Sequence, residues 1–143
     1  MSSDPFRPQK PSHITSVTEG LCALTATEAV ARLRAGEVTA AELVEASIAR
    51  IEEVDPKVNA LPIPCFDRAR DMARKLRPED HADNPKSLCG LPIAVKDYND
   101  VGGVRTTYGS PIFAQSVAAQ SDATVRQLER NGAIPMAKSN VPE

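Results

Sequence analysis

The sequence predicts a mixed α/β fold with a largely parallel β-sheet, and three observations support this prediction. Two segments with helical apolar spacing, each preceded by an N-terminal capping signal, follow one another between residues 25 and 55. Two short apolar runs, 91–95 and 133–137, have the length of buried strands. A helical segment lies between these runs, and a strand–helix–strand connection is nearly always right-handed and joins parallel strands.

The two N-terminal helices are predicted from their caps and their apolar spacing. A Thr-x-x-Glu capping box opens each helix, at 25–28 and at 39–42. Gly36 is placed to end the first helix. Asp55 and Pro56 are predicted to end the second, because the residue before a proline avoids the helical conformation. We expect the pair to pack on the rest of its own domain, and docking of a partner chain is the alternative.

The chain on either side of these helices is predicted to be only partly regular. Residues 60–64 form a short strand, which its two prolines weaken or place at a sheet edge. Residues 65–76 follow helical spacing, and residues 77–87, with two prolines and many charges, are interpreted as a surface linker. Residues 1–16 hold three prolines and lack the apolar run of a signal peptide, so we expect a flexible N-terminal arm. The predicted order is therefore two helices followed by β-α-β-α-β units.

Composition argues against several classes of function. A chain with 41% hydrophobic and 25% charged residues can bury a core, while a net charge of −2 and 3% aromatic residues argue against nucleic-acid contact. No apolar segment reaches the length needed to span a bilayer. Cys22, Cys65 and Cys89 are odd in number and widely spaced, so we expect free thiols in a cytoplasmic protein. His13 and His81 lack cysteine partners at ligand spacing, so no metal site is predicted.

Lys96 directly follows the apolar run 91–95 and so lies at the carboxyl end of a predicted strand. In open α/β sheets, ligands and chemistry gather at this end. A lysine there is either an ordinary solvated charge or a general base. The second role requires burial or nearby positive charge, because free lysine, with a pKa of about 10.4, is neutral in only about one molecule in a few thousand at pH 7. Asp97 leaves the strand on the opposite face, so we expect no ion pair between the two residues.

The segment 97–121 shows no strong periodicity, which is typical of a functional loop or a disordered one. Polar side chains that could line a pocket follow one another at Thr106, Thr107, Tyr108 and Ser110. We favour the alternative that they hydrogen-bond the backbone of turns. Ser110 precedes a proline and has no base nearby in the sequence, so it is not a candidate nucleophile.

A helix and a strand are predicted at the end of the sequence. Ser121 or Asp122 caps the helix, which ends near Gly132, and the strand 133–137 follows. The polar run Lys-Ser-Asn at 138–140 comes directly after that strand. We expect these residues to anchor backbone around a site and not to take part in chemistry.

The run Gly-Leu-Pro-Ile-Ala-Val-Lys-Asp at 90–97 resembles the lysine motif of the amidase signature family of serine hydrolases. Further motifs of that family follow in the same order, at 100–103, 106–110, 122–125 and 132–143. The two N-terminal helices also resemble the opening segment of the family. The resemblance covers residues 20–143, and the ordered set of motifs is more specific than any one of them.

The resemblance implies a Ser–Ser–Lys triad and no cofactor. Lys96 matches the triad lysine, which takes a proton from a bridging serine; that serine deprotonates the nucleophilic serine, which attacks an amide carbonyl and forms an acyl-enzyme. In the family, both serines lie in a Gly/Ser-rich segment downstream of the last motif. No serine of this sequence stands in such a segment. We therefore expect residues 17–143 to be the N-terminal part of an amidase domain, cut before the catalytic serine segment.

The expected parent activity is hydrolysis of the carboxamide C–N bond of a small-molecule substrate, with Lys96 as the base. The 143-residue chain alone is predicted to be inactive and to leave Lys96 solvated. Two alternatives stay open: a fragment of the glutaminase/amidotransferase subunit of transfer-RNA-dependent amidation, and a non-catalytic truncated docking module. A homo-oligomer is also left open, since a cut parallel sheet exposes apolar surface and strand edges.

Overall fold

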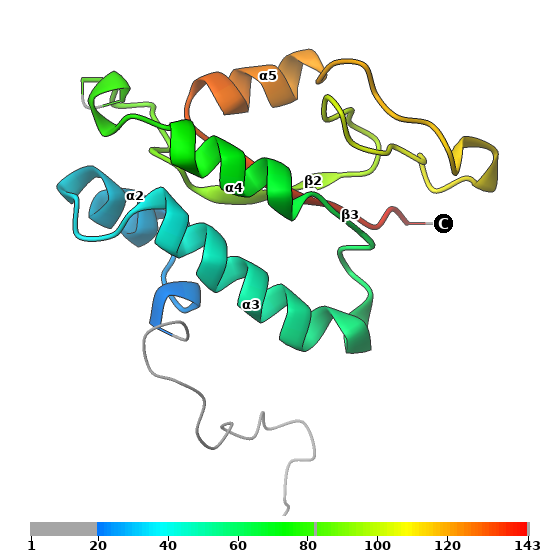
Figure 1. The fold of residues 1–143 in the computed structure, drawn as a ribbon, viewed down its shortest axis with the longest axis horizontal. Helices are drawn as coiled ribbons and strands as arrows, with labels where there is room; N and C mark the ends of the chain where they lie inside the picture. Colours follow the sequence, from blue (N-terminus) through cyan, green and yellow to red (C-terminus); the bar gives the residue numbers. More distant parts are fainter. Residues whose placement is uncertain (1–19, 82, 143) are drawn as a thin grey trace, which may run out of the picture.

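The computed structural model describes residues 20–81 and 83–142, and the predicted N-terminal arm lies outside these ranges. The regular elements follow one another along the chain as shown in Figure 1. The helices are α2 (Ala26–Ala35), α3 (Ala40–Val58), α4 (Phe66–Lys75) and α5 (Ala123–Arg130), the strands are β1 (Ile63–Pro64), β2 (Pro92–Lys96) and β3 (Ile134–Ser139), and the short 3-10 helices are η1 (Pro78–Asp80) and η2 (Pro111–Phe113). This order confirms the predicted pair of helices followed by alternating strands and helices.

The three strands form one sheet in the order β1-β3-β2, with β3 in the middle. β2 runs parallel to β3, as predicted, whereas the two-residue β1 pairs antiparallel with the end of β3. The edge position of β1 accommodates Pro64, as the sequence indicates. β2 forms the other edge, and within the described ranges no further strand pairs with its outer side.

Hydrophobic side chains pack on both faces of the sheet. On one face, Ile134 and Met136 of β3 pack with buried residues of α2, α3 and α4; α3 and α4 lie side by side in Figure 1. On the other face, Val95 of β2 packs with Val125 of α5 and with Val101 of the loop after β2. Both faces are therefore covered, which is the condition for a parallel sheet to be stable in water.

An irregularity in the parallel pair decides which way the end of β3 faces. The register shifts between Ile93 and Ala94, and β3 gains one extra residue there. Lys138 pairs with Val95 and so lies on the face of that residue, away from α3 and α4. Without the extra residue, strict alternation would place Lys138 on the same face as Met136, among the helices.

The capping boxes form at both predicted sites, with Thr25 and Thr39 as N-cap residues. The predicted end of the second helix is wrong, because α3 continues through Pro56 to Val58. A proline in the last turn leaves only one carbonyl without its helical partner, and on an exposed helix end water can replace that bond. Asn59, in the left-handed conformation with φ 52°, ends the helix instead.

All three cysteines of the described ranges, Cys22, Cys65 and Cys89, are free thiols, as predicted. Burial raises the pKa of the Cys65 thiol to about 11, which disfavours the nucleophilic thiolate form at neutral pH. Among the helices of residues 20–81 and 83–142, none has the length and apolar character required to cross a membrane.

Position 90, at the entry to β2, requires glycine because of its backbone conformation and because of the close packing around it. Its φ is +99°, and a β-carbon there would lie 2.5 Å from the Cβ of Ala40 at the start of α3. We expect Gly90→Ala to lower the free energy of unfolding by about 2–5 kcal/mol, because left-handed strain of about 1–2 kcal/mol adds to overpacking of about 1–3 kcal/mol.

Gly103→Ala is the matched control for Gly90→Ala. Gly103 also has a positive φ, of +76°, but no atom lies within 4 Å of the position of an added β-carbon. This control therefore isolates the backbone strain, and urea unfolding of both variants measures the difference. Equal losses in the two variants would contradict a tight contact between Gly90 and Ala40.

Candidate active site

Lys96 is the last residue of β2 and lies at the carboxyl edge of the sheet, where the sequence predicts it. It pairs with Ser139 of β3, and its carbonyl oxygen accepts a hydrogen bond from the Asn99 N–H at 2.9 Å. The side chain is exposed, and its Nζ lies 5.3 Å from the centroid of the Tyr98 ring, within cation–π distance. The amine of this chain therefore extends into solvent from a fixed strand end.

A second lysine at this edge is fully buried. Lys138 of β3 donates from Nζ to Asp97 Oδ1 at 3.0 Å and to Thr106 Oγ1 at 2.9 Å, and the side chain of Asp97 is itself only 5% exposed. Asp97 thus pairs with Lys138 and not with Lys96. The sequence predicts only that Lys138 anchors backbone, and it does not predict this pair. A fully buried lysine requires a partner of opposite charge, but only the structure shows that Lys138 is buried.

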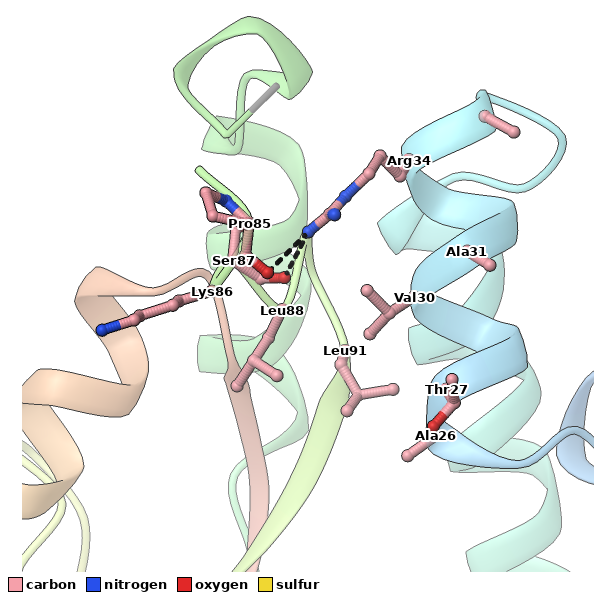
Figure 2. Close-up of a pocket in the computed structure, with 11 residues that line it drawn as sticks. Ala26, Thr27, Val30, Ala31, Arg34, Pro85, Lys86, Ser87, Leu88 and Leu91 are labelled. Carbon is pink, nitrogen blue, oxygen red and sulfur yellow. Dashed lines mark hydrogen bonds between the residues drawn. The ribbon is translucent and has the colours of Figure 1, made fainter. Parts of the chain in front are cut away.

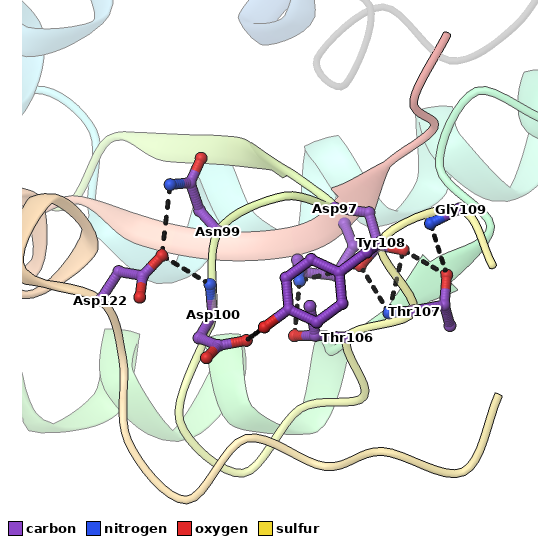
Figure 3. A network of polar contacts seen from close by, with 9 residues as sticks. Asp97, Asn99, Asp100, Thr106, Thr107, Tyr108, Gly109 and Asp122 are labelled. Carbon is purple, nitrogen blue, oxygen red and sulfur yellow. Dashed lines mark hydrogen bonds and ion pairs between the residues drawn. The ribbon is translucent and has the colours of Figure 1, made fainter. Parts of the chain in front are cut away.

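Two threonines of the loop after β2 complete this buried network, shown in Figure 3. Thr106 accepts from Lys138, while Thr107 donates to Asp97 both its backbone N–H, at 3.1 Å, and its hydroxyl, at 2.5 Å. Ser110 accepts from the backbone N–H of Ile112 at 3.3 Å. The favoured interpretation, in which these hydroxyl groups hold loop backbone, is right for Ser110 and for Thr107, whose hydroxyl accepts from the Gly109 N–H at 3.3 Å. It is wrong for Thr106 and Tyr108, whose hydroxyl groups bond to the side chains of Lys138 and Asp100.

The loop 97–122 is ordered by acidic side chains. Asp122 occupies the predicted N-cap position of α5, but its carboxylate makes no capping bond to the helix. It accepts instead from the Asp100 N–H at 3.0 Å and from Asn99 Nδ2 at 3.2 Å, and Tyr108 donates its hydroxyl to Asp100 at 3.0 Å (Figure 3). These bonds connect the start of α5 to the turn directly after Lys96. The segment is therefore an ordered loop, and the disordered alternative does not apply to it.

Asp97 is expected to make the stability of the protein depend on pH. Burial alone raises the pKa of its carboxyl, but the hydrogen bonds from Thr107 and Lys138 outweigh burial and hold the pKa below the usual value of 3.8. A carboxyl whose pKa is lower in the folded state contributes stability above its unfolded-state pKa, and this contribution is lost as the pH falls through the folded-state value. We expect the free energy of unfolding to decline below about pH 4, and Asp97→Asn to remove part of that decline.

Urea unfolding between pH 7 and pH 2 measures this effect. Glu42→Gln allows comparison of the buried carboxylate with an exposed one. The pKa of Glu42 is also lowered, by the hydrogen bonds that its carboxylate accepts from Thr39, but Glu42 lies on the surface. An identical pH profile in Asp97→Asn and in the unmodified chain would show that the buried carboxylate does not contribute to the acid sensitivity.

A metal cluster or a groove elsewhere on the chain could also form a site. Within residues 20–81 and 83–142, no three His, Cys, Asp or Glu side chains gather as metal ligands. A groove of about 730 Å³ lies between α2 and the segment that leads into β2 (Figure 2), where Val30 and Leu91 form apolar walls and Arg34 donates to the Ser87 carbonyl at 3.1 Å. This groove lies at the amino end of β2, opposite to Lys96, and does not contribute to the candidate site.

Comparison with known proteins decides the family. The family model described as Amidase matches residues 42–143, which include the whole of the loop and both strands of the candidate site. The chain belongs to the amidase family. The resemblance seen in the motifs from 90–97 onward is thereby confirmed.

The relatives of this amidase family member include enzymes of more than one kind. AmiB2 of Mycobacterium tuberculosis, named as a putative amidase, is 42% identical over 109 residues, which are 76% of this chain and 23% of AmiB2. A glutamyl-tRNA(Gln) amidotransferase subunit of Anaeromyxobacter dehalogenans is 39% identical over 124 residues, which are 86% of this chain and 25% of the relative. The chain thus spans about a quarter of the length of these relatives.

A solved structure confirms the fold. The crystal structure of a bacterial aryl acylamidase of the amidase signature family matches with a TM-score of 0.73 at 24% identity, over 83% of this chain and 25% of the acylamidase. At this identity the match is evidence for the fold alone. The chain has the fold of the corresponding quarter of such an enzyme, as expected of an incomplete amidase-signature fold.

Proposed function

We propose that this chain is the N-terminal portion of an amidase that hydrolyses carboxamide bonds, and that Lys96 is the base of a Ser–Ser–Lys triad. The observation that carries the proposal is the place of Lys96 at the end of β2, on the carboxyl edge of a parallel pair and within the motif 90–97. Membership of the amidase family supports the reaction class. The proposed substrate is a small-molecule carboxamide.

In this mechanism the chain supplies the proton acceptor and not the nucleophile. The Lys96 amine takes the proton of a bridging serine, and that serine takes the proton of the nucleophilic serine as its oxygen attacks the amide carbonyl. The C–N bond then breaks, the leaving amine takes up a proton, and water releases the acyl group. A lysine acts as a general base when burial or nearby positive charge favours its neutral form. Because Lys96 is exposed here, the serine-bearing segment has to cover the amine as well as provide both hydroxyl groups.

The chain alone is therefore expected to release neither ammonia nor an amine from carboxamides. The test is to read the coding sequence beyond codon 143 and to assay the polypeptide extended through an in-frame Gly/Ser-rich segment. Turnover by the extended polypeptide, but not by the 143-residue chain, supports the proposal. Turnover by the 143-residue chain that Lys96→Ala abolishes would overturn it.

A second candidate is the glutaminase/amidotransferase subunit of transfer-RNA-dependent amidation. The similarity to the amidotransferase relative from Anaeromyxobacter dehalogenans, at 39% identity over 86% of this chain, favours it. The two candidates share the proposed chemistry of Lys96 and differ in the amide. A strong preference of the extended polypeptide for glutamine over other carboxamides supports the amidotransferase candidate.

The helical docking module is the least supported alternative. Ala29 and Leu33 of α2, and Leu43 and Val44 of α3, are buried in the same core as residues of β3. The apolar stripes that a partner would need are thus already used inside the chain, as expected from the usual origin of helix stability.

A further inference from the structure

The buried ion pair between Lys138 and Asp97 lies next to the proposed base, on the opposite face of the sheet. Asp97 follows Lys96 in the sequence, and alternation along the strand places the two side chains on opposite faces. On the face of Val95, the Asp97 carboxylate accepts from Lys138 Nζ at 3.0 Å and from the Thr107 N–H at 3.1 Å. The Asp97 N–H also extends the ladder by donating to the Ser139 carbonyl at 3.1 Å. Asp97 is thus held by its backbone and its side chain at the point where Lys96 leaves the sheet.

The register shift in β3 brings Lys138 to this point. The extra residue of β3, opposite the step from Ile93 to Ala94, turns Lys138 to the face of Val95 and Asp97. Lys138 is 0% exposed, so its charge is stabilised by the Asp97 carboxylate and by Thr106 as second hydrogen-bond acceptor, and not by water. A rotation of the chain at Lys96 would separate Asp97 from this cation and leave the buried Lys138 charge without its counter-ion.

We infer that Lys138 and Asp97 are positioning residues that hold the Lys96 amine at the carboxyl end of β2, on the face of the sheet opposite to their own and over the Tyr98 ring. The inference rests on the proposed function of Lys96. The contact between Lys96 Nζ and the Tyr98 ring, at 5.3 Å, reports the position of the amine without any need for catalysis. If the Lys138–Asp97 ion pair had only a structural role, its loss would lower the free energy of unfolding but leave the contact between Lys96 and Tyr98 unchanged in the folded chain.

The test uses the 143-residue chain and a carbon–proton NMR correlation of its lysine ε-CH₂ groups. The ring of Tyr98 shifts the Lys96 signal, and Tyr98→Leu defines the unshifted position. We expect Lys138→Met to remove most of this shift, and Thr107→Val, which deletes one hydroxyl bond to Asp97, to remove a smaller part. Lys75→Met, on the exposed end of α4, is the matched control and is expected to leave the shift intact.

Thr107→Val keeps the test decisive if Lys138→Met fails to fold, because it leaves the ion pair itself in place. An unchanged Lys96 signal in folded Lys138→Met, or in Thr107→Val if the former is unfolded, would overturn the inference. Failure of the proposed function is seen separately, in the rate of amide hydrolysis by the extended polypeptide. Loss of the ring shift in Lys138→Met together with full activity of Lys96→Ala would sustain the positioning role and reject the role of Lys96 as base.

Discussion

Lys138→Met is expected to lower the free energy of unfolding by about 3–5 kcal/mol, the typical cost of removing one partner of a buried ion pair. The substitution keeps the length of the side chain but leaves the buried carboxylate of Asp97 without its cation. Thr106 also loses its donor. Urea unfolding at pH 7 measures the loss, provided that the transition stays two-state.

Two further variants show whether the loss comes from the ion pair. Lys75→Met removes an exposed lysine from α4 and is expected to change the free energy of unfolding by less than about 0.5 kcal/mol. The double variant with Asp97→Asn is expected to lose less than the sum of the single losses, because it leaves no unpaired charge. A loss below about 1 kcal/mol in Lys138→Met would mean that the pair adds little to the folded state.

Lys96→Ala is expected to lower the rate of amide hydrolysis by the extended polypeptide at least about 100-fold, the usual lower limit for losing a general base. The same change is expected to alter the free energy of unfolding by less than about 0.5 kcal/mol, because the side chain is exposed. Ammonia release and urea unfolding of the same preparations separate the two effects.

Two controls show whether Lys96 acts as a base. Lys86→Ala removes an exposed lysine near the amino end of β2, and full activity is expected. Lys96→Arg keeps the positive charge but offers a group that does not lose its proton in proteins, so it is expected to be as inactive as Lys96→Ala. An active Lys96→Arg would indicate that Lys96 acts as a fixed charge and not as a base.

The helical part of the fold was predictable because its signals are local. Thr25 and Thr39 lie three residues before their glutamate partners, so both capping boxes can be read directly from the sequence. The end of α3 differs from the prediction because the left-handed Asn59, and not the proline before it, ends the helix three residues later. Boundaries of this kind depend on hydrogen bonds that compete over a few residues.

The candidate site was only half predictable. The place of Lys96 follows from the apolar run before it, a local signal. The partner of Asp97 does not, because Lys138 is 41 residues away and reaches the carboxylate only through the register shift in β3. Strand register is set by contacts across the sheet, and a shift of one residue moves side chains to the other face. No local pattern in the sequence records that shift.

The most direct test of the proposed role of Lys96 is covalent labelling of serine by a fluorophosphonate, which reacts with activated serine hydroxyl groups. We predict that the polypeptide extended through the Gly/Ser-rich segment is labelled at one serine of that segment, and that Lys96→Ala and Lys96→Arg abolish this labelling while the protein stays folded. The 143-residue chain is predicted to stay unlabelled. Labelling of Lys96→Ala at the rate of the unmodified extended polypeptide would contradict the role of Lys96 as the base that activates the nucleophile.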